Sequence, residues 1–321
     1  MCIRDSDNTA GQVAAGYWEA SEGGMATVYM VKNIDDGPTP NHRGGIRVHA
    51  YVAGHTSKHA IDWRFTLTPG DSTGFLLSIS NGALVVTSTE TGKVIGTTNT
   101  NIEPDAEGIY RGYTIFIVTS GVPSPPGTPS PILGPNDAPL AVSSALITPT
   151  YYVGVNCVSV RGADTNGDGT ITLGEALPTL NATLNLYSYF GRWYSDEDTY
   201  GQLIIVFPAA RDQCNYDPET NPIEIRGRNW DEAEHNVSFW MNVDEAERIP
   251  ITNNYPTSLP FISGVGDATS GWVEIFAAAI PPQPPYTCLN PGMFGFTLME
   301  EPVLGRADAL PLFHAMVPGI Q

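Results

Sequence analysis

Short apolar runs separated by turn-forming residues constrain this fold more than any other feature of the sequence. The runs are five to eight residues long, are rich in β-branched and aromatic residues, and end at clusters of Gly, Pro, Asn and Asp. The 33 glycines and 27 prolines disfavour long helices, and no stretch keeps the period of an amphipathic helix. One short helix is expected to start near Thr172 and to stop before Pro178, because proline has no amide hydrogen to donate inside a helix. The sequence therefore predicts an all-β fold.

The charge balance excludes several kinds of partner. Acidic residues outnumber basic residues 34 to 15, which gives a formal net charge of −19 at pH 7. A chain of this charge is repelled by nucleic acid and by anionic lipid, so neither is expected as a partner. No apolar run approaches the length of about 18 residues that a membrane-spanning helix needs, so no membrane span is expected.

The two halves of the chain share a pattern of strands. Apolar residues occupy every second position after His59, and they do so again after His235. An apolar strand at Ile46 precedes the first histidine by 13 residues, and one at Ile223 precedes the second by 12 residues. The repeated order and spacing indicate two tandem antiparallel β-sandwich domains, immunoglobulin-like or jelly-roll-like, joined at a calcium-binding loop.

Composition suggests where these domains begin and end. Residues 1–6 are expected to be a sequencing artefact of a metagenomic fragment, so any signal peptide is presumed to be lost with the true start. The first sandwich domain is predicted at residues 7–160, with a proline-rich surface loop at 120–139. The calcium loop and the short helix are predicted at 161–180, and the second sandwich domain at 181–321.

The motif with the most specific chemistry lies at the predicted junction. The twelve residues 164–175, DTNGDGTITLGE, carry oxygen donors at the spacing that a calcium ion requires, because Ca²⁺ takes six to eight oxygen ligands. Gly169 is expected to supply the turn with positive φ, and Ile171 to anchor the loop in the core. The predicted ligands are Asp164, Asn166, Asp168, Thr170 through its carbonyl oxygen, Thr172 through a water, and Glu175 through both carboxylate oxygens.

This loop resembles those of EF-hand and dockerin-like proteins, although a strand rather than a helix leads into it. With no partner helix to open, the loop is not expected to act as a switch. The ion is expected instead to fix the geometry between the two domains.

Three cysteines remain once residues 1–6 are set aside. Cys214 and Cys288 lie in polar, turn-rich segments, and we predict a disulfide between them, which requires an oxidising compartment. Two free thiols in a cytosolic protein are the alternative. Cys157 lies in an apolar run and is expected to be a buried, unreactive thiol.

Five aromatic residues gather just after the predicted junction. Such a group either packs in a core or an interface, or binds sugars by stacking on their rings, and the sequence leaves both interpretations open. The residues are Tyr187, Tyr189, Phe190, Trp193 and Tyr194.

No constellation of residues predicts catalysis. The histidines between residues 42 and 59 lack a fitting acid and the spacing of a zinc site, and the acidic clusters at 196–198 and 231–234 are expected to be solvated turns. No nucleophile elbow, phosphate-binding loop or zinc-protease motif is present. The chain is therefore not expected to be an enzyme.

About 70 residues of the first half resemble secreted bacterial proteins of unassigned activity. The pattern is a strand ending in V-x-N, a basic strand, a serine-containing loop and a strand closing on an L-[ST]-P-x-D turn. The residues that carry it are Val31, Asn33, Arg47, Val48, Ser57, Leu67, Thr68, Pro69 and Asp71. The resemblance implies a β fold and export, and it supplies no catalytic residue.

These inferences together predict a bacterial structural protein stabilised by Ca²⁺ and located outside the cell or on its surface. Its expected partner is itself, in a surface layer or a filament, because exposed strand edges can pair between copies. The alternative is a carbohydrate-binding or adhesive module of the cell surface, in which the partners are glycans.

Overall fold

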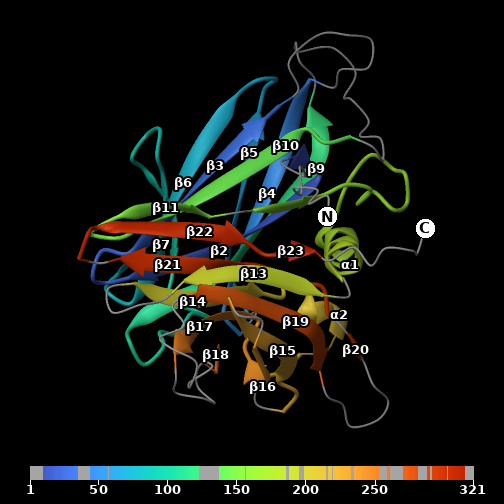
Figure 1. Cartoon of the computed structure of the whole chain (residues 1–321). Coiled ribbons are helices and arrows are strands. Elements are labelled where there is room, and N and C mark those ends of the chain that lie inside the picture. The colour runs from blue at the N-terminus through green and yellow to red at the C-terminus, as the bar shows by residue number, and fades with distance from the viewer. Residues whose placement is uncertain are drawn as a thin grey trace.

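The all-β prediction is confirmed by the computed structural model, in which strands greatly outnumber helices (Figure 1). The structure describes residues 10–34, 44–56, 58–122, 137–155, 157–185, 188–194, 199–214, 216–218, 220–232, 235–252, 259–260, 270–280, 288–289, 291–301 and 303–314. Among these residues, no helix has the length and apolar character needed to cross a membrane.

Residues from the first half of the chain form two sheets. Sheet A has the strand order β1-β10-β3-β6-β7-β8, with β11 also paired to β10. Its strands are β1 (Ala10–Gly11), β3 (Ala26–Asn33), β6 (Ser72–Ser80), β7 (Ala83–Ser88), β8 (Val94–Thr98), β10 (Leu140–Ile147) and β11 (Tyr152–Val155). Sheet B has the order β12-β2-β9-β4-β5. Its strands are β2 (Val13–Ser21), β4 (Gly45–Gly54), β5 (His59–Leu67), β9 (Ile109–Val122) and β12 (Val158–Val160).

Residues from the second half form two more sheets. Sheet C has the order β16-β15-β19-β13-β23, with β20 also paired to β19. Its strands are β13 (Tyr189–Tyr194), β15 (Ile223–Asp231), β16 (Asn236–Val243), β19 (Ser270–Ile280), β20 (Cys288–Leu289) and β23 (Phe313–His314). Sheet D has the order β18-β17-β14-β21-β22. Its strands are β14 (Tyr200–Val206), β17 (Ala246–Thr252), β18 (Leu259–Pro260), β21 (Phe294–Glu301) and β22 (Arg306–Pro311).

The strand orders of the two halves correspond to the repeat seen in the sequence. The order β5-β4-β9-β2 in sheet B matches β16-β15-β19-β13 in sheet C, and all of these pairs are antiparallel. The ladder between β4 and β9 has a register shift at Arg47/Val48, and the ladder between β15 and β19 has one at Arg226/Gly227. The order β10-β3-β6 in sheet A likewise matches β21-β14-β17 in sheet D.

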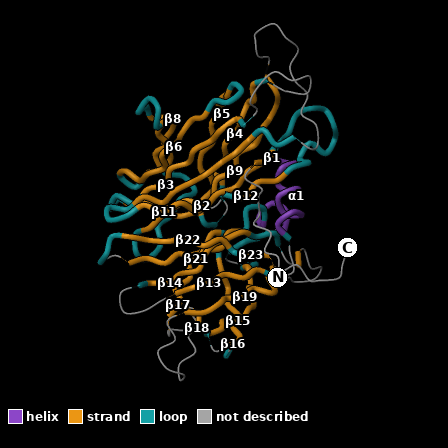
Figure 2. The backbone as a smooth tube through the Cα atoms, turned by 45° about the horizontal axis from the view of Figure 1, so that its top comes forward, coloured by secondary structure: helices purple, strands orange, loops and turns teal. Residues whose placement is uncertain are grey.

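Sheets B and D lie between the two halves (Figures 1 and 2). Their central strands β2, β9, β14 and β21 are buried over most of their length on both faces, whereas the edge strands β5 and β22 are partly exposed. Side chains alternate along a strand, so Leu203 and Ile205 of β14 join the core of the second half, whereas Ile204 and Val206 join the core of the first. Phe296 of β21 belongs to that same first core and meets the Tyr17 ring edge-on. The halves are therefore held together by a continuous apolar interior.

The helix after the predicted calcium loop is longer than the sequence suggested. Helix α1 (Leu173–Leu184) passes through Pro178, so the prediction that it stops before this proline is wrong. Proline inside a helix costs about 3 kcal/mol, but burial of a leucine side chain contributes about 1.5–3 kcal/mol, and Leu177, Leu180 and Leu184 are all buried. A second short helix, α2 (Ala210–Cys214), was not expected.

The proline-rich segment also differs from its prediction at one end. Strand β9 continues to Val122 and pairs with β4 at Ser120, so the first residues assigned to the loop 120–139 belong to a strand. Residues 123–136 of this segment lie outside the described residues.

Candidate functional site

The loop at residues 164–175 folds around its own acidic side chains. Asp164 accepts hydrogen bonds from the backbone amides of Gly167 at 2.8 Å and Gly169 at 2.9 Å. Asn166 and Asp168 each accept a further backbone amide at 2.8 Å. Gly167 and Gly169 have φ angles of 75° and 80°, which confirms that the loop needs glycine at its turn. The side-chain oxygens of positions 1, 3 and 5 are thus held by the backbone of the same loop.

The last predicted ligand caps the helix that follows the loop. Glu175 accepts hydrogen bonds from the backbone amide of Thr172 at 2.9 Å and from its hydroxyl at 2.8 Å. These bonds lower the pKa of the Glu175 carboxyl, and bonds from Thr170 lower that of Asp168. Within the described ranges, no three His, Cys, Asp or Glu side chains are grouped closely enough to hold a metal ion by themselves. The predicted calcium site therefore depends on mixed donors: two aspartates, an asparagine, the Thr170 carbonyl, a water on Thr172, and Glu175.

The loop and helix α1 are attached to both halves of the molecule. On the side of the first half, Thr170 bridges to Ser120, and the amide of Ala163 donates to Gln12 at 2.9 Å. On the side of the second half, Asn181 of α1 accepts a hydrogen bond from the amide of Gly292 at 2.8 Å. The loop thus contacts the first half and the helix that follows it contacts the second, whereas a calcium site at this junction stays a prediction.

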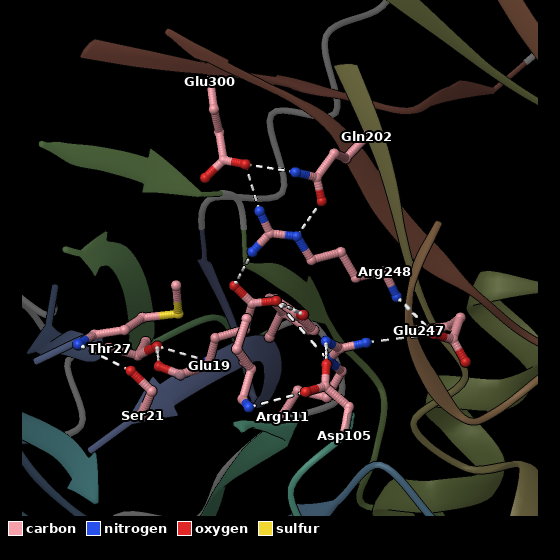
Figure 3. Close-up of polar contacts among 12 residues, drawn as sticks. Glu19, Ser21, Thr27, Asp105, Arg111, Gln202, Glu247, Arg248 and Glu300 are labelled. Atoms are coloured by element: carbon pink, nitrogen blue, oxygen red, sulfur yellow. Dashed lines mark hydrogen bonds and ion pairs between the residues drawn. The ribbon is translucent and has the colours of Figure 1, made fainter. Parts of the chain in front are cut away.

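A second feature of this joint is a buried cluster of charges that the sequence did not reveal (Figure 3). Arg248 of β17 donates to Glu19 of β2 at 2.8 Å, and also to Glu300 of β21 and to Gln202 of β14. The Glu19 and Arg248 side chains are only 1% and 10% exposed. This guanidinium therefore joins a carboxylate of the first half to two side chains of the second.

Arg111 of β9 is an arginine of the first half that pairs with an acid of the second half. It donates to Asp105 in its own half and to Glu247 of β17 at 3.4 Å. Each half thus contributes one arginine that pairs with an acid of the other. Glu245 adds a third crossing, because it accepts a hydrogen bond from the Tyr113 hydroxyl at 3.1 Å.

A cavity of about 410 Å³ opens beside this cluster, between the two halves. Its lining includes Asp105, Glu107, Arg111, Tyr200, Arg248 and Glu300. Because the two arginines already pair with carboxylates, the cavity has no free positive charge to offer an anionic ligand.

The buried Glu300 is expected to make this joint sensitive to pH. Burial, followed by the charges of Glu19 and Glu107, raises the pKa of its carboxyl to about 7. A carboxyl whose pKa is higher in the folded than in the unfolded state stabilises the fold fully below its ordinary pKa of about 4.5. This contribution is lost as the pH rises through about 7.

We therefore expect wild-type stability to fall between pH 5 and pH 8 more steeply than that of Glu300→Gln, which carries no titrating group at this position. The measurement is the urea midpoint of both proteins across this range. Equal slopes would show that Glu300 does not govern the pH response.

The described residues of the predicted aromatic group lie on strand β13, with side chains on both of its faces. Tyr189 and Trp193 point into the second core, where Trp193 donates to Asn229 at 2.6 Å. Phe190 is half-buried and Tyr194 is exposed on the opposite face, while Tyr187 lies outside the described residues. The four described residues therefore do not form one sugar-binding platform, because successive side chains of a strand face opposite ways.

The cysteines fall into two groups. Cys157 is a free thiol between β11 and β12, and burial raises its pKa to about 12. Cys214 is fully buried and is disulfide-bonded, but its partner sulfur and the side chain of Cys288 lie outside the described residues. The particular pairing of Cys214 with Cys288 stays a prediction.

We expect Cys157 of the native protein to resist alkylation by iodoacetamide at pH 8, because only the thiolate reacts. Mass spectrometry should detect the adduct rapidly only after the protein is unfolded in urea. Fast labelling of the native protein would contradict the assignment of a buried thiol.

Two of the histidines, His49 and His59, have an acidic neighbour, Asp62, that the sequence did not indicate. Asp62 lies 2.6 Å from Nε2 of His49 and 3.4 Å from Nε2 of His59, so the expectation that no acid fits these residues is wrong. The His49 Nδ1 atom is 2.7 Å from the Tyr51 hydroxyl. Both ring nitrogens of His49 therefore have polar partners within its own hairpin, as in a structural histidine.

A scan against models of known protein families finds no match for this chain, and a search among curated proteins finds none similar to it.

Proposed function

We propose that this chain is an extracellular structural protein, stabilised by calcium, whose copies assemble into a surface layer or a filament. The observation that carries the proposal is the joint between the halves. A protein that transmits force or keeps a lattice in register needs a stiff connection between its modules. Here an apolar interior, crossing ion pairs and the loop at 164–175 support that stiffness.

Under this proposal the four sheets form two related sandwich domains. Sheets A and B would make one domain and sheets C and D the other, in agreement with the matching strand orders. The inner sheets B and D would then form the contact between domains. The burial of their central strands on both faces supports a fixed orientation rather than a flexible linker.

Calcium would bind in the 164–175 loop. Asp164, Asn166 and Asp168 would supply side-chain oxygens, Thr170 its carbonyl, Thr172 a bound water, and Glu175 its carboxylate. When bound, the ion would offset two of the three negative charges of the loop carboxylates and hold the start of α1 against β9. Millimolar calcium outside the cell keeps even a weak site of this kind filled.

The experiment is negative-stain electron microscopy of the purified full chain over a range of concentrations, with calcium and with a chelator. Ordered lattices or fibres in calcium would support the proposal. Separate particles at every concentration would contradict it.

The alternative of a glycan-binding module has weaker support, since Tyr194 is the exposed member among the described residues of the predicted aromatic group. A glycan array with wild type and Tyr194→Ala tests it: binding lost in the variant would favour this alternative.

A further inference from the structure

The outer face of sheet C concentrates aromatic and arginine side chains on an acidic protein. We define this face by six residues that point away from the second core: Arg192, Arg226, Arg228, Trp240, Trp272 and Phe276. Trp240 is 59% exposed, and Trp272 and Phe276 are 39% and 38% exposed. They come from four neighbouring strands, β13, β15, β16 and β19, so the sequence does not show them as one group.

The register of the strands places these residues beside one another. Arg226 is paired with Trp240 across β15 and β16, and Arg192 is paired with Trp272 across β13 and β19. Two guanidinium groups lie over aromatic rings: Arg192 is 5.9 Å from the Trp272 centroid, and Arg228 is 5.3 Å from that of Phe276. Because guanidinium groups cover these rings, the rings are poorly placed to stack on sugars.

Glutamates accompany the arginines on this face. Arg226 pairs with Glu224 at 2.6 Å, Arg192 pairs with Glu232 at 3.2 Å, and Glu274 is the strand neighbour of Arg228. Three arginines against three glutamates leave this group without net charge, whereas the whole chain carries −19. Because charges more than about 8 Å apart are largely screened at physiological salt, the local balance decides which surfaces can meet.

We propose that this face binds the same face of a second copy of the chain, which names a surface for the self-association in the proposed function and rests on it. Two copies of an acidic protein repel each other, and a locally neutral surface reduces that repulsion. A pattern of alternating arginine and glutamate is complementary to itself, since a two-fold contact sets the arginines of one copy against the glutamates of the other. Trp, Tyr and Arg are also the residues that contribute most to protein interfaces. The two-fold pair would be the unit that a second contact extends into a lattice.

Charge reversal tests the contact. The variant Arg228→Glu changes the charge of the face by −2, and Glu274→Arg changes it by +2. In sedimentation velocity of the full chain in calcium, we expect each variant alone to associate at least tenfold more weakly than wild type. An equimolar mixture of the two should recover association, because the altered faces are then opposite in charge. Arg306→Glu is the matched control, since Arg306 is an exposed arginine paired with Glu301 on sheet D and should leave association unchanged.

Substitution of an aromatic residue on this face tests the same contact in a second way. Trp240→Ala should weaken association about five- to tenfold, while Tyr152→Ala, which removes an aromatic that is 80% exposed on sheet A, should not. Wild type that remains a monomer at all concentrations would overturn both this inference and the proposed function. Assembly that proceeds equally in Arg228→Glu, Glu274→Arg and Trp240→Ala would overturn this inference alone. Loss in each variant without recovery in the mixture would also overturn the self-complementary contact.

Discussion

Replacing Arg248 by methionine is expected to lower the free energy of unfolding by about 3–5 kcal/mol at neutral pH. The guanidinium of Arg248 is the close partner of Glu19, which is almost fully buried, and it also contacts Glu300 and Gln202. Methionine has a similar length but no charge. It would leave the Glu19 carboxylate inside the protein without its closest cation, and a buried unpaired charge is strongly destabilising. Urea unfolding followed by circular dichroism measures the loss.

Two further variants separate this effect from a general cost of losing an arginine. Arg306→Met removes an exposed arginine that pairs with Glu301, and such pairs contribute about 0–1 kcal/mol. Adding Glu19→Gln to Arg248→Met should recover part of the stability, because the buried group is then neutral. A loss below about 1 kcal/mol for Arg248→Met would show that the ion pairs do not hold the joint.

Millimolar calcium is expected to raise the melting temperature of the full chain by about 4 °C over the chelated protein. A ligand at 100 times its dissociation constant stabilises a fold by about 2.7 kcal/mol, and each kcal/mol shifts the melting temperature of a chain of 321 residues by about 1.5 °C. The loop contacts β9 of the first half and leads directly into helix α1, which contacts the second half, so the ion should stabilise the start of this helix as well as the loop itself. Differential scanning calorimetry with calcium and with chelator measures the shift.

Variants of the loop test whether the calcium-induced shift in melting temperature comes from an ion bound at residues 164–175. Asp164→Ala removes a ligand and two loop hydrogen bonds, whereas Glu175→Gln can still cap the helix but loses a charged ligand. Both should reduce the shift to near zero. Asp71→Ala alters an aspartate in a turn outside the loop and should keep the full shift. A wild-type melting curve that calcium does not change would remove the calcium site from the proposal.

Much of the architecture could be read from the sequence because it depends on local patterns. The alternation of apolar residues after His59 and after His235 predicted β5 and β16, and the turn residues between the runs predicted where strands end. The loop at 164–175 could be predicted as a calcium site because such a loop places its donors within twelve consecutive residues, and calcium binding there stays a prediction. Pro178 misled the prediction of helix length, since a local penalty was outweighed by leucines that pack against distant strands.

The charge cluster and the outer face of sheet C could not be predicted in this way. Glu19 and Arg248 are 229 positions apart, and nothing near either residue in the sequence indicates a partner. Arg192 and Trp272 likewise become neighbours only through the pairing of β13 with β19.

By itself the sequence determined that this protein is built of strands, repeats its strand pattern and carries one loop with the donors of a calcium site. Periodicity and turn chemistry are properties of neighbouring residues, so they are visible in a single chain. The tertiary structure alone decided which side of each strand is buried, which charges meet between the halves and which aromatic residues remain at the surface. The physical reason is that burial and ion pairing depend on which strands become neighbours, and strand pairing joins residues that are far apart in the sequence.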